Sequence, residues 1–455
     1  MSTPSDSTNS HIVAVIGGAT AGAEVAAQLA GKGVRVVVFE MNPRPFGKIE
    51  DGLPRWHVGL RNKEYDTISA KLALPGVEFV PNTKVGEDVS FEDLAREWGF
   101  SAVILANGAW RDRPLPIEGA DAYVGKGLIY QNPFIIYFNH LEEDVEPAET
   151  FEFLDDAIVV GGGLASIDVA KVLMLETTRA KLRERGIEAD MVELEVKGIP
   201  KILAQHDLEF SDLGLKGCTI FYRRRVEDMP LAEIPEGADE ARATKVRTAR
   251  ARLLEKAQKK FFFKMEPLSA PDGLIVEDGR AVGVRFRRTR IEDGRVKMTD
   301  ETYERRGSCI ISSIGSIPEP IPGIEMKGEL FAFTDWDVGR IEGYPTLFSV
   351  GNVVTGKGNI VASRKHAASV YEAALESFLG IGEDGHTTEA DLDSNAESAA
   401  TATANAVAAS LEHAEAPSAD TLAAILARVQ ARQKEVGYGG DLATWLEQVK
   451  PKERA

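Results

Sequence analysis

Cysteine is almost absent from this chain of 455 residues. Only Cys218 and Cys309 occur, and neither belongs to a Cys-x-x-Cys pair. Two isolated cysteines exclude a disulfide framework, a redox-active dithiol and a cysteine-held iron–sulfur cluster within this polypeptide. Any electrons that the protein handles must therefore pass to an acceptor outside the chain.

Histidine, positive charge and long apolar runs are also scarce. The seven histidines are scattered without metal-ligand spacing, so we expect no metal site. The formal net charge of −18 argues against general nucleic-acid binding. No apolar stretch is long enough to span a bilayer, and residues 1–10 lack the apolar core of a secretory signal. These absences predict a cytoplasmic protein that binds neither membrane nor nucleic acid.

Two glycine-rich turns, at 17–22 and 161–166, are the most informative features that are present. Each follows a short apolar run typical of a β-strand, at 12–16 and 157–160. Small residues between a strand and a helix let the backbone approach a pyrophosphate. The helix N-terminus then offers N–H groups and the positive end of its dipole. Two such turns predict two dinucleotide sites.

The first turn has the features of a site for FAD or NAD(H). Gly17 is expected to form the tight turn, Gly22 to let the helix pack on the strand, and Ala19 to fill the middle position. Glu40 follows the next predicted strand, 34–39. An acid there accepts hydrogen bonds from a ribose 2′-hydroxyl and repels a 2′-phosphate. A strand–turn–helix without a ligand is the alternative.

The second turn differs from the first in the charge that follows it. Gly161 and Gly163 keep the pattern, and the next predicted strand, 218–222, leads into Arg223 and Arg224. Guanidinium groups suit a terminal phosphate better than a ribose hydroxyl. We therefore expect the two arginines to bind the 2′-phosphate of NADP(H), with a solvated cluster at a strand end as the alternative.

Two further strand patterns mark where the chain crosses between domains. Residues 102–109 and 309–315 each predict a buried strand that ends in a small-residue turn, and prolines follow both. We expect an α/β fold with two Rossmann-like dinucleotide-binding domains, the NADP domain inserted into the FAD domain, plus a helical C-terminal extension. The expected divisions are a disordered leader over 1–10, the FAD-binding domain over 11–115 and 319–382, the NADP-binding domain over 116–318, a flexible linker over 383–417 and the helical extension over 418–455.

The C-terminal part has a different composition. Residues 383–417 are rich in Ala, Thr, Ser and acids, which favours a flexible linker or a weak helix. Ser418 is expected to cap an amphipathic helix, and 442–449 to form a short last helix that bears Trp445. We expect this extension to pack on the body of the protein; a partner-docking tail is the alternative.

These motifs resemble those of the FAD-dependent, NADP-linked reductases, a family that includes adrenodoxin reductase, ferredoxin–NADP reductases and the glutamate synthase small subunit. The resemblance covers roughly residues 11–380 and is carried by both turns, by the loop 45–57 and by 219–230. The chain departs from the family's usual motifs at Asn107 and Asn352.

The resemblance implies FAD and NADP(H) as cofactors. It also implies a relay in which NADPH gives hydride to the flavin, which then passes single electrons to an iron–sulfur carrier such as ferredoxin. His57 is the candidate catalytic residue, because the family places a histidine of this loop near the flavin; an exposed or structural histidine is the alternative.

A helix over 360–378 is expected to point its N-terminus at a flavin carbonyl, unless it belongs to an ordinary strand–loop–helix. The residues expected to bind the cofactors are Gly17, Ala19, Ala21, Gly22, Glu40, Met41, Gly47, Ala106, Asn107, Gly108, Gly161, Gly163, Leu164, Ala165, Ser166, Arg223, Arg224, Gly315, Gly351, Asn352, Gly358, Asn359 and Ile360.

The segment 242–264 is strongly basic in a chain that is acidic overall, with Glu255 as its one acid. A basic face would speed the encounter with an acidic ferredoxin, although a solvated helix face explains the pattern equally well. A second basic run spans 285–290 and could extend either role. Two other functions stay open: an electron-input subunit of a larger reductase or synthase complex, and a non-catalytic flavin-binding regulatory protein.

Overall fold

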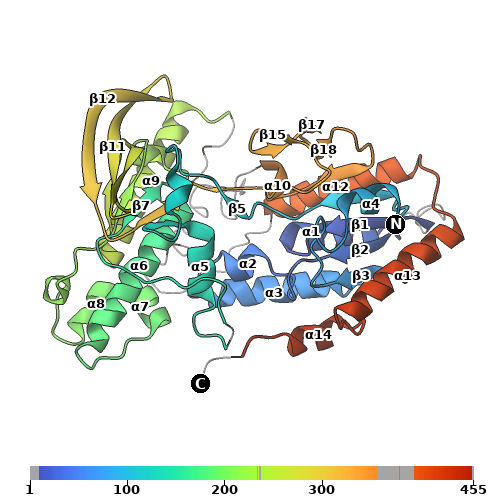
Figure 1. The fold of residues 1–455 in the computed structure, drawn as a ribbon, viewed down its shortest axis with the longest axis horizontal. Helices are drawn as coiled ribbons and strands as arrows, with labels where there is room; N and C mark the ends of the chain where they lie inside the picture. The colour runs from blue at the N-terminus through green and yellow to red at the C-terminus, as the bar shows by residue number, and fades with distance from the viewer. Residues whose placement is uncertain are drawn as a thin grey trace.

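The computed structural model describes residues 10–144, 146–232, 234, 237–355, 379 and 394–452. These residues build two α/β halves that lie side by side along the longest axis of the molecule (Figure 1). Each half has a five-stranded parallel sheet with helices packed on it. The expected α/β fold with two Rossmann-like units is confirmed.

The first sheet has the strand order β19-β4-β1-β2-β3, and all its pairs are parallel. Its strands are short apolar runs whose side chains are almost all buried, as expected for a parallel sheet covered on both faces. The main helices of this half are α1 (Thr20–Ala30), α3 (Val58–Leu72) and α4 (Phe91–Arg96). The strands are β1 (Ile12–Ile16), β2 (Arg35–Phe39), β3 (Val77–Val80), β4 (Ala102–Leu105) and β19 (Leu347–Ser349).

The second sheet has the order β6-β13-β7-β8-β9 and is also parallel throughout. Its strands are β6 (Leu128–Tyr130), β7 (Ile158–Gly161), β8 (Thr219–Phe221), β9 (Lys264–Glu266) and β13 (Ile310–Ser313). The helices of this half are α5 (Gln131–Asn139), α6 (Leu164–Arg183), α7 (Met191–Lys197), α8 (Ile199–Ala204) and α9 (Glu240–Phe261).

An antiparallel sheet packs against this second half. It consists of β10 (Ser269–Glu277), β11 (Arg280–Glu292) and β12 (Arg295–Arg306). The ring of Phe286 on β11 stacks on that of Phe221 on β8, with 4.1 Å between the ring centroids. The basic run 285–290 therefore lies within a packed strand.

The chain crosses between the halves twice, and the two crossings pair with each other. The short strands β5 (Arg111–Asp112) and β14 (Ser316–Ile317) form an antiparallel ladder. All strands of the second half lie between these crossings in sequence, and β19 returns to the first sheet. On this topology we propose 11–115, 116–318 and 319–382 as the domain divisions. Further short elements are α2 (Lys48–Asp51), α10 (Asn352–Thr355), β15 (Met326–Lys327), β16 (Leu330–Phe331), β17 (Phe333–Asp335) and β18 (Arg340–Ile341).

Of the two expectations for 383–417, a flexible linker or a weak helix, the described part of that stretch contradicts the flexible linker, because it contains a helix. Ser394–Leu411 forms the helix α12, which packs on α1. Both helices meet through small side chains, and Ala400 and Ala404 are fully buried there. Alanine is the strongest helix former and lets two helices approach closely, so a segment with few large apolar groups still packs.

The C-terminal extension consists of α13 (Ala419–Glu435) and α14 (Leu442–Gln448). The Ser418 hydroxyl caps α13 by accepting a hydrogen bond from the Thr421 N–H at 3.1 Å. The Trp445 indole N–H donates to the Pro43 carbonyl at 2.8 Å, so the extension packs on the first half, as expected. None of the helices described is long and apolar enough to cross a membrane.

Candidate active site

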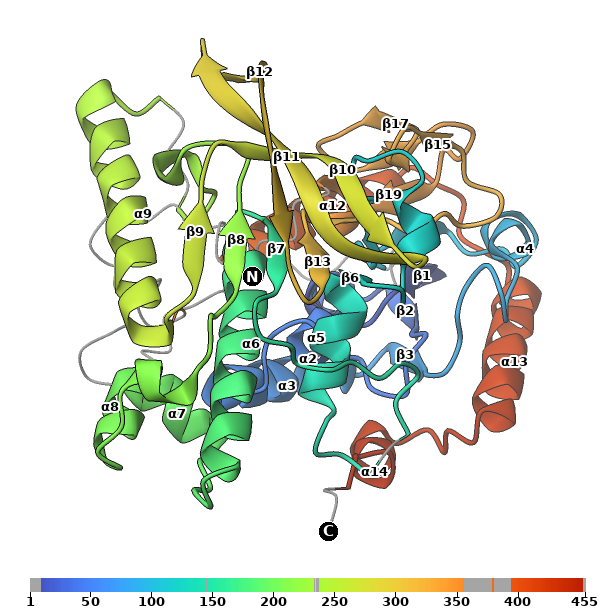
Figure 2. The same ribbon diagram turned by 60° about the vertical axis from the view of Figure 1, so that its left-hand side comes forward.

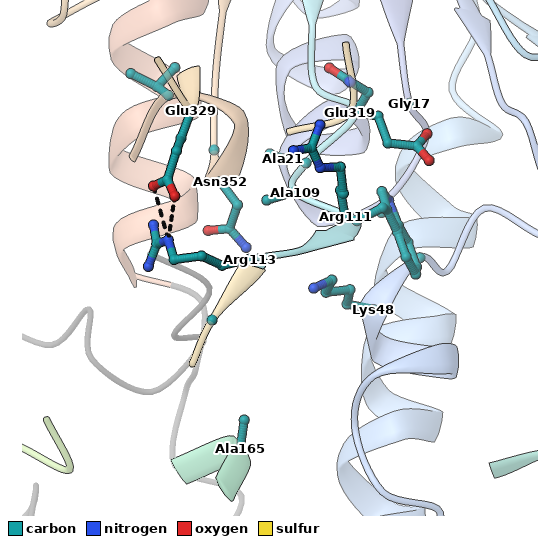
Figure 3. Close-up of a pocket in the computed structure, with 18 of the residues that line it drawn as sticks. Gly17, Ala21, Lys48, Ala109, Arg111, Arg113, Ala165, Glu319, Glu329 and Asn352 are labelled. Atoms are coloured by element: carbon teal, nitrogen blue, oxygen red, sulfur yellow. Dashed lines mark hydrogen bonds and ion pairs between the residues drawn. The ribbon is translucent and has the colours of Figure 1, made fainter. Parts of the chain in front are cut away.

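One cavity of about 1650 Å³ reaches from the first glycine turn to the second. Gly17 and Ala21 lie on one wall, and Ala165 lies across the space from them (Figure 3). Pockets for one small molecule usually measure about 300–1,000 Å³. The cavity therefore has room for two ligands, one on each turn.

The first turn brings the backbone close to this cavity. Gly17 has φ +101°, and a Cβ there would lie 2.6 Å from the Ala106 carbonyl oxygen. A Cβ on Gly22 would lie 1.9 Å from the Gly17 carbonyl oxygen. Only glycine fits at these two positions. No side chain caps the N-terminus of α1, so its first N–H groups are available to a phosphate.

Glu40 stands at the carboxyl end of β2 and is only 4% exposed. Its Oε2 accepts a hydrogen bond from the Gly18 N–H at 2.8 Å, and its Oε1 accepts one from the Asn42 N–H at 2.9 Å. Burial raises the pKa of the Glu40 carboxyl to about 7, although these N–H groups favour the ionised form. Each carboxylate oxygen keeps a lone pair that can accept a ribose hydroxyl.

Two buried polar atoms in the cavity wall have no hydrogen-bond partner among the described residues. They are Oδ1 of Asn107, after β4, and Oγ of Ser349, at the end of β19. A buried polar atom left without a partner costs about 1–3 kcal/mol. A ligand with hydroxyl or ring N–H donors would satisfy such atoms, so this half of the cavity fits FAD.

The second turn is built in a similar way. A Cβ on Gly161 would lie 2.3 Å from the Ser313 carbonyl oxygen, and one on Gly162 would lie 2.0 Å from the Tyr222 ring. No side chain caps the N-terminus of α6, which begins after Gly163. This half therefore also offers a close backbone approach and free N–H groups to a pyrophosphate.

The three arginines after β8 separate into two groups. Arg223 and Arg224 line the cavity, whereas Arg225 does not; Asp228 pairs with Arg225 at 2.9 Å and lies 3.9 Å from Arg224. Arg224 donates to the Gly294 carbonyl at 3.0 Å. Arg223 is exposed and forms no ion pair with the described acids. Two guanidinium groups thus face the cavity beside the second turn, as a 2′-phosphate site requires.

The structure places most of the expected cofactor-binding residues around one cavity. Gly22 and Ser166 lie behind its wall, and Ser166 Oγ donates back to the Gly163 carbonyl at 2.7 Å. Gly358, Asn359 and Ile360, like the helix over 360–378, lie outside the described residues. The expected residues that line the cavity are Gly17, Ala19, Ala21, Glu40, Met41, Gly47, Ala106, Asn107, Gly108, Gly161, Gly163, Leu164, Ala165, Arg223, Arg224, Gly315, Gly351 and Asn352.

His57 lies away from this cavity. It is 4% exposed and precedes α3. Burial, followed by the charges of Lys171 and Arg61, holds the pKa of the His57 imidazole well below its usual value. The ring is therefore neutral at pH 7, and a direct catalytic role for it stays a prediction.

Several charged residues of the cavity wall were not singled out from the sequence. Lys48, Arg111, Arg113, Glu319 and Glu329 all line it (Figure 3). The Arg113 guanidinium pairs with Glu329 at 2.9 Å. Lys48 directly follows Gly47, so its place beside an expected cofactor residue was the signal that could have identified it. Among the described residues, no group of three or more histidine, cysteine or acidic side chains could hold a metal ion.

Comparison with known proteins agrees with this geometry. Residues 13–211 match the family described as pyridine nucleotide-disulphide oxidoreductase. NADPH:adrenodoxin oxidoreductase of Arabidopsis thaliana is 24% identical over 78% of this chain and 80% of its own length. The glutamate synthase [NADPH] small chain of Bacillus subtilis is 30% identical over 37% of this chain. That match covers only 33% of the length of the relative.

A solved structure shares the whole fold. FprA from Mycobacterium tuberculosis, determined in complex with NADPH, superposes with a TM-score of 0.64 at 20% identity. The match covers 93% of this chain and 91% of FprA. The resemblance drawn from the two turns is confirmed.

Proposed function

We propose that this FAD- and NADP-dependent oxidoreductase carries electrons from NADPH through FAD to an external iron–sulfur carrier such as ferredoxin. One observation carries the proposal: a single cavity joins the turn that precedes Glu40 to the turn that precedes Arg223. Hydride transfer requires two dinucleotides whose reactive rings meet, and a shared cavity provides that meeting place.

In this proposal the residues of the chain bind the two cofactors and orient them. Gly17 and the N-terminus of α1 hold the FAD pyrophosphate, and Glu40 binds its ribose. The N-terminus of α6 and the pair Arg223 and Arg224 hold NADP(H). The bound flavin supplies the redox chemistry, since it accepts a hydride and releases electrons singly. No side-chain nucleophile or general base is needed.

An acceptor outside the chain is supported by the two cysteines. Both thiols are free and buried, and neither residue lines the cavity. Burial also raises the pKa of the Cys309 thiol to about 11, so it stays protonated. Electrons therefore have no dithiol to reduce within this chain. The relative named for adrenodoxin supports a small electron-carrier protein as the recipient.

The basic segment 242–264 is the proposed docking region for an acidic carrier. It lies mostly on α9, at the outer edge of the second sheet beside β9 (Figure 2). Arg242 and Lys245 are exposed there, but Arg250 is buried and donates to the Ala232 carbonyl at 2.9 Å. Arg250 therefore belongs to the fold and not to the docking face.

The second basic run contributes little to such a face, because acids pair with its four arginines. Arg285 and Arg287 share Asp272, at 3.1 and 3.0 Å. Arg288 and Arg290 pair with Glu266 and Glu292, at 2.5 and 2.7 Å. The proposed docking region is thus limited to the exposed cations of 242–264.

A second candidate function is an electron-input subunit of a larger complex. The glutamate synthase small chain is a relative of this kind by name, and its match with this chain is 30% identical over 174 residues. Purification of the native protein separates the two functions, because a subunit would come with a large partner at fixed stoichiometry. A stand-alone reductase would not.

The proposed function predicts that NADPH bleaches the flavin absorbance of the holoenzyme within milliseconds to seconds. The cavity brings the two nucleotide sites together, so no slow assembly step is needed. Anaerobic stopped-flow mixing at the flavin absorbance maximum measures this rate. A flavin that stays oxidised in excess NADPH would refute the proposal and favour a regulatory role.

The docking region predicts that electron transfer to an acidic ferredoxin slows steeply with salt. Charge steering weakens as the ions screen the exposed cations of α9. The reversals Arg242→Glu and Lys245→Glu should lower the rate at low salt and flatten its salt dependence. Ferredoxin-coupled cytochrome reduction from 10 mM to 500 mM salt measures both effects. Unchanged rates in both variants would place the docking face elsewhere.

A further inference from the structure

Lys48 is a cationic side chain in the cavity wall to which the proposed function assigns no role. It is the first residue of α2, directly after Gly47, and it is half-buried. Figure 3 shows Lys48 between the wall that carries Gly17 and Ala21 and the wall that carries Ala165. The ammonium group thus lies in the space between the two dinucleotide turns.

Neutral groups hold this ammonium in place. Nζ donates to Asn132 Oδ1 at 3.3 Å and to Ser316 Oγ at 3.1 Å, and it lies 5.5 Å from the centre of the Trp110 ring. No described acid forms an ion pair with it. The nearest acid in this network is Asp112, whose carboxylate accepts a hydrogen bond from the Asn132 N–H at 3.1 Å.

These partners are themselves fixed. The Asn132 side chain donates to the Trp110 carbonyl at 2.8 Å and to Ser316 Oγ at 3.1 Å. Asp112 and Ser316 belong to β5 and β14, the paired strands where the chain crosses between the halves. The Lys48 ammonium is therefore anchored at the junction of the two halves and does not move freely in solvent.

The partial burial of this charge is costly, and Asp112 offsets only part of the cost. Burial lowers the pKa of the Lys48 ammonium to about 8, while Asp112 acts in the opposite direction. The group is still mostly protonated at pH 7. A partly desolvated cation whose hydrogen bonds go only to neutral groups is stabilised further when negative charge develops beside it.

We infer that Lys48 sets the reduction potential of the flavin by stabilising the negative charge that the ring gains on reduction. This inference rests on the proposed function. A flavin ring that reached the nicotinamide of the second dinucleotide would lie in the cavity between the two turns, and Lys48 lines that cavity. A fixed positive charge near the ring is one of the means by which a protein tunes a flavin.

Asn132 and Ser316 are positioning residues in this scheme. They orient the ammonium without neutralising it, since both are uncharged acceptors. Ser316→Ala removes one anchor and keeps the charge. Its effect on the potential should therefore be smaller than that of removing the charge.

The test is the midpoint potential of the holoenzyme, measured by anaerobic reductive titration with a reference dye. Lys48→Met removes the charge and keeps an unbranched side chain that is one heavy atom shorter. The reduced form should become at least about tenfold less favourable, which is a fall of about 30 mV for a two-electron couple. Lys48→Arg should keep the wild-type potential. Lys126→Met, at an exposed lysine outside the cavity, makes the same change in net charge and should also leave the potential unchanged.

The outcomes separate this inference from the proposed function. Wild-type potentials in both Lys48→Met and the likewise uncharged Lys48→Gln would overturn the role of Lys48 while NADPH still reduces the flavin. An equal fall in Lys126→Met would also overturn it, because net charge alone would then explain the shift. A wild-type protein that binds no FAD would instead refute the proposed function. Lys48→Gln provides the measurement if Lys48→Met does not fold.

Discussion

Replacing Arg223 and Arg224 together with alanine is expected to raise the KM for NADPH by about hundredfold or more, because each of the two guanidinium groups loses a hydrogen bond to a charged group that contributes about 1.5–3 kcal/mol. The KM for NADH should stay nearly unchanged, since NADH lacks the 2′-phosphate. Both arginines line the cavity beside the second turn. Steady-state rates with each nucleotide give the comparison.

The neighbouring Arg225 provides a matched control. It ends the same run of three arginines but pairs with Asp228 and lies off the cavity, so Arg225→Ala should leave the preference for NADPH intact. Among single variants, Arg223→Ala should have the larger effect, because Arg224 is also held by the Gly294 carbonyl. Equal losses with NADPH and NADH in the double variant would contradict a phosphate site.

The sequence predicts the two nucleotide turns well because their requirements are local. Gly17 supplies the positive φ of the turn, Gly22 packs on the Gly17 carbonyl oxygen within the same turn, and Glu40 follows at the end of the next strand. The same holds for the second turn and the arginines after β8. Each pattern spans a single βαβ unit, so its chemistry is visible in the order of residues.

The role of Lys48 depends instead on contacts that span the chain. Its two hydrogen-bond partners are 84 and 268 residues away in sequence. No local pattern predicts that the two crossings meet there. Only the fold shows that this lysine enters the cavity with neutral partners.

Runs of charged residues in the sequence are misleading as predictors of a docking face, for a related reason. The arginines of 285–290 appear unpaired in the sequence, but Asp272 on the neighbouring strand β10 forms ion pairs with two of them. Arg250 lies in a basic segment and yet turns inward to bind backbone carbonyls. A count of charges cannot distinguish a docking face from a set of ion pairs, because pairing depends on strand register.

The buried position of His57 shows that a resemblance to a family has a similar limit. A shared motif does not reveal which of its side chains are buried. The loop 45–57 keeps the family's glycine and histidine, and Gly47 does line the cavity. The histidine ten residues later is buried beside Trp56, with 6.0 Å between the ring centroids, and neither residue lines the cavity. A motif places residues along the chain, whereas the direction of each side chain depends on what packs around it.

Gly22→Ala is expected to weaken FAD binding by about tenfold to hundredfold, because forcing a methyl group into a packed site typically costs about 1–3 kcal/mol. The new Cβ would lie 1.9 Å from the Gly17 carbonyl oxygen. The clash forces α1 away from the turn, and the N–H groups at the start of α1 move with it. Titration of apoprotein with FAD, followed by the quenching of flavin fluorescence, measures the affinity.

Gly59→Ala is the control for this change, since a Cβ at Gly59 meets nothing within 4 Å and the residue is exposed on α3. Alanine is also the better helix former, so that variant should bind FAD like the wild type. Far-UV circular dichroism separates lost affinity from lost folding. A folded Gly22→Ala protein with wild-type affinity would mean that FAD does not bind at the first turn. The assignment of Glu40 to its ribose would then fail as well, because both residues serve the same nucleotide in the proposed site.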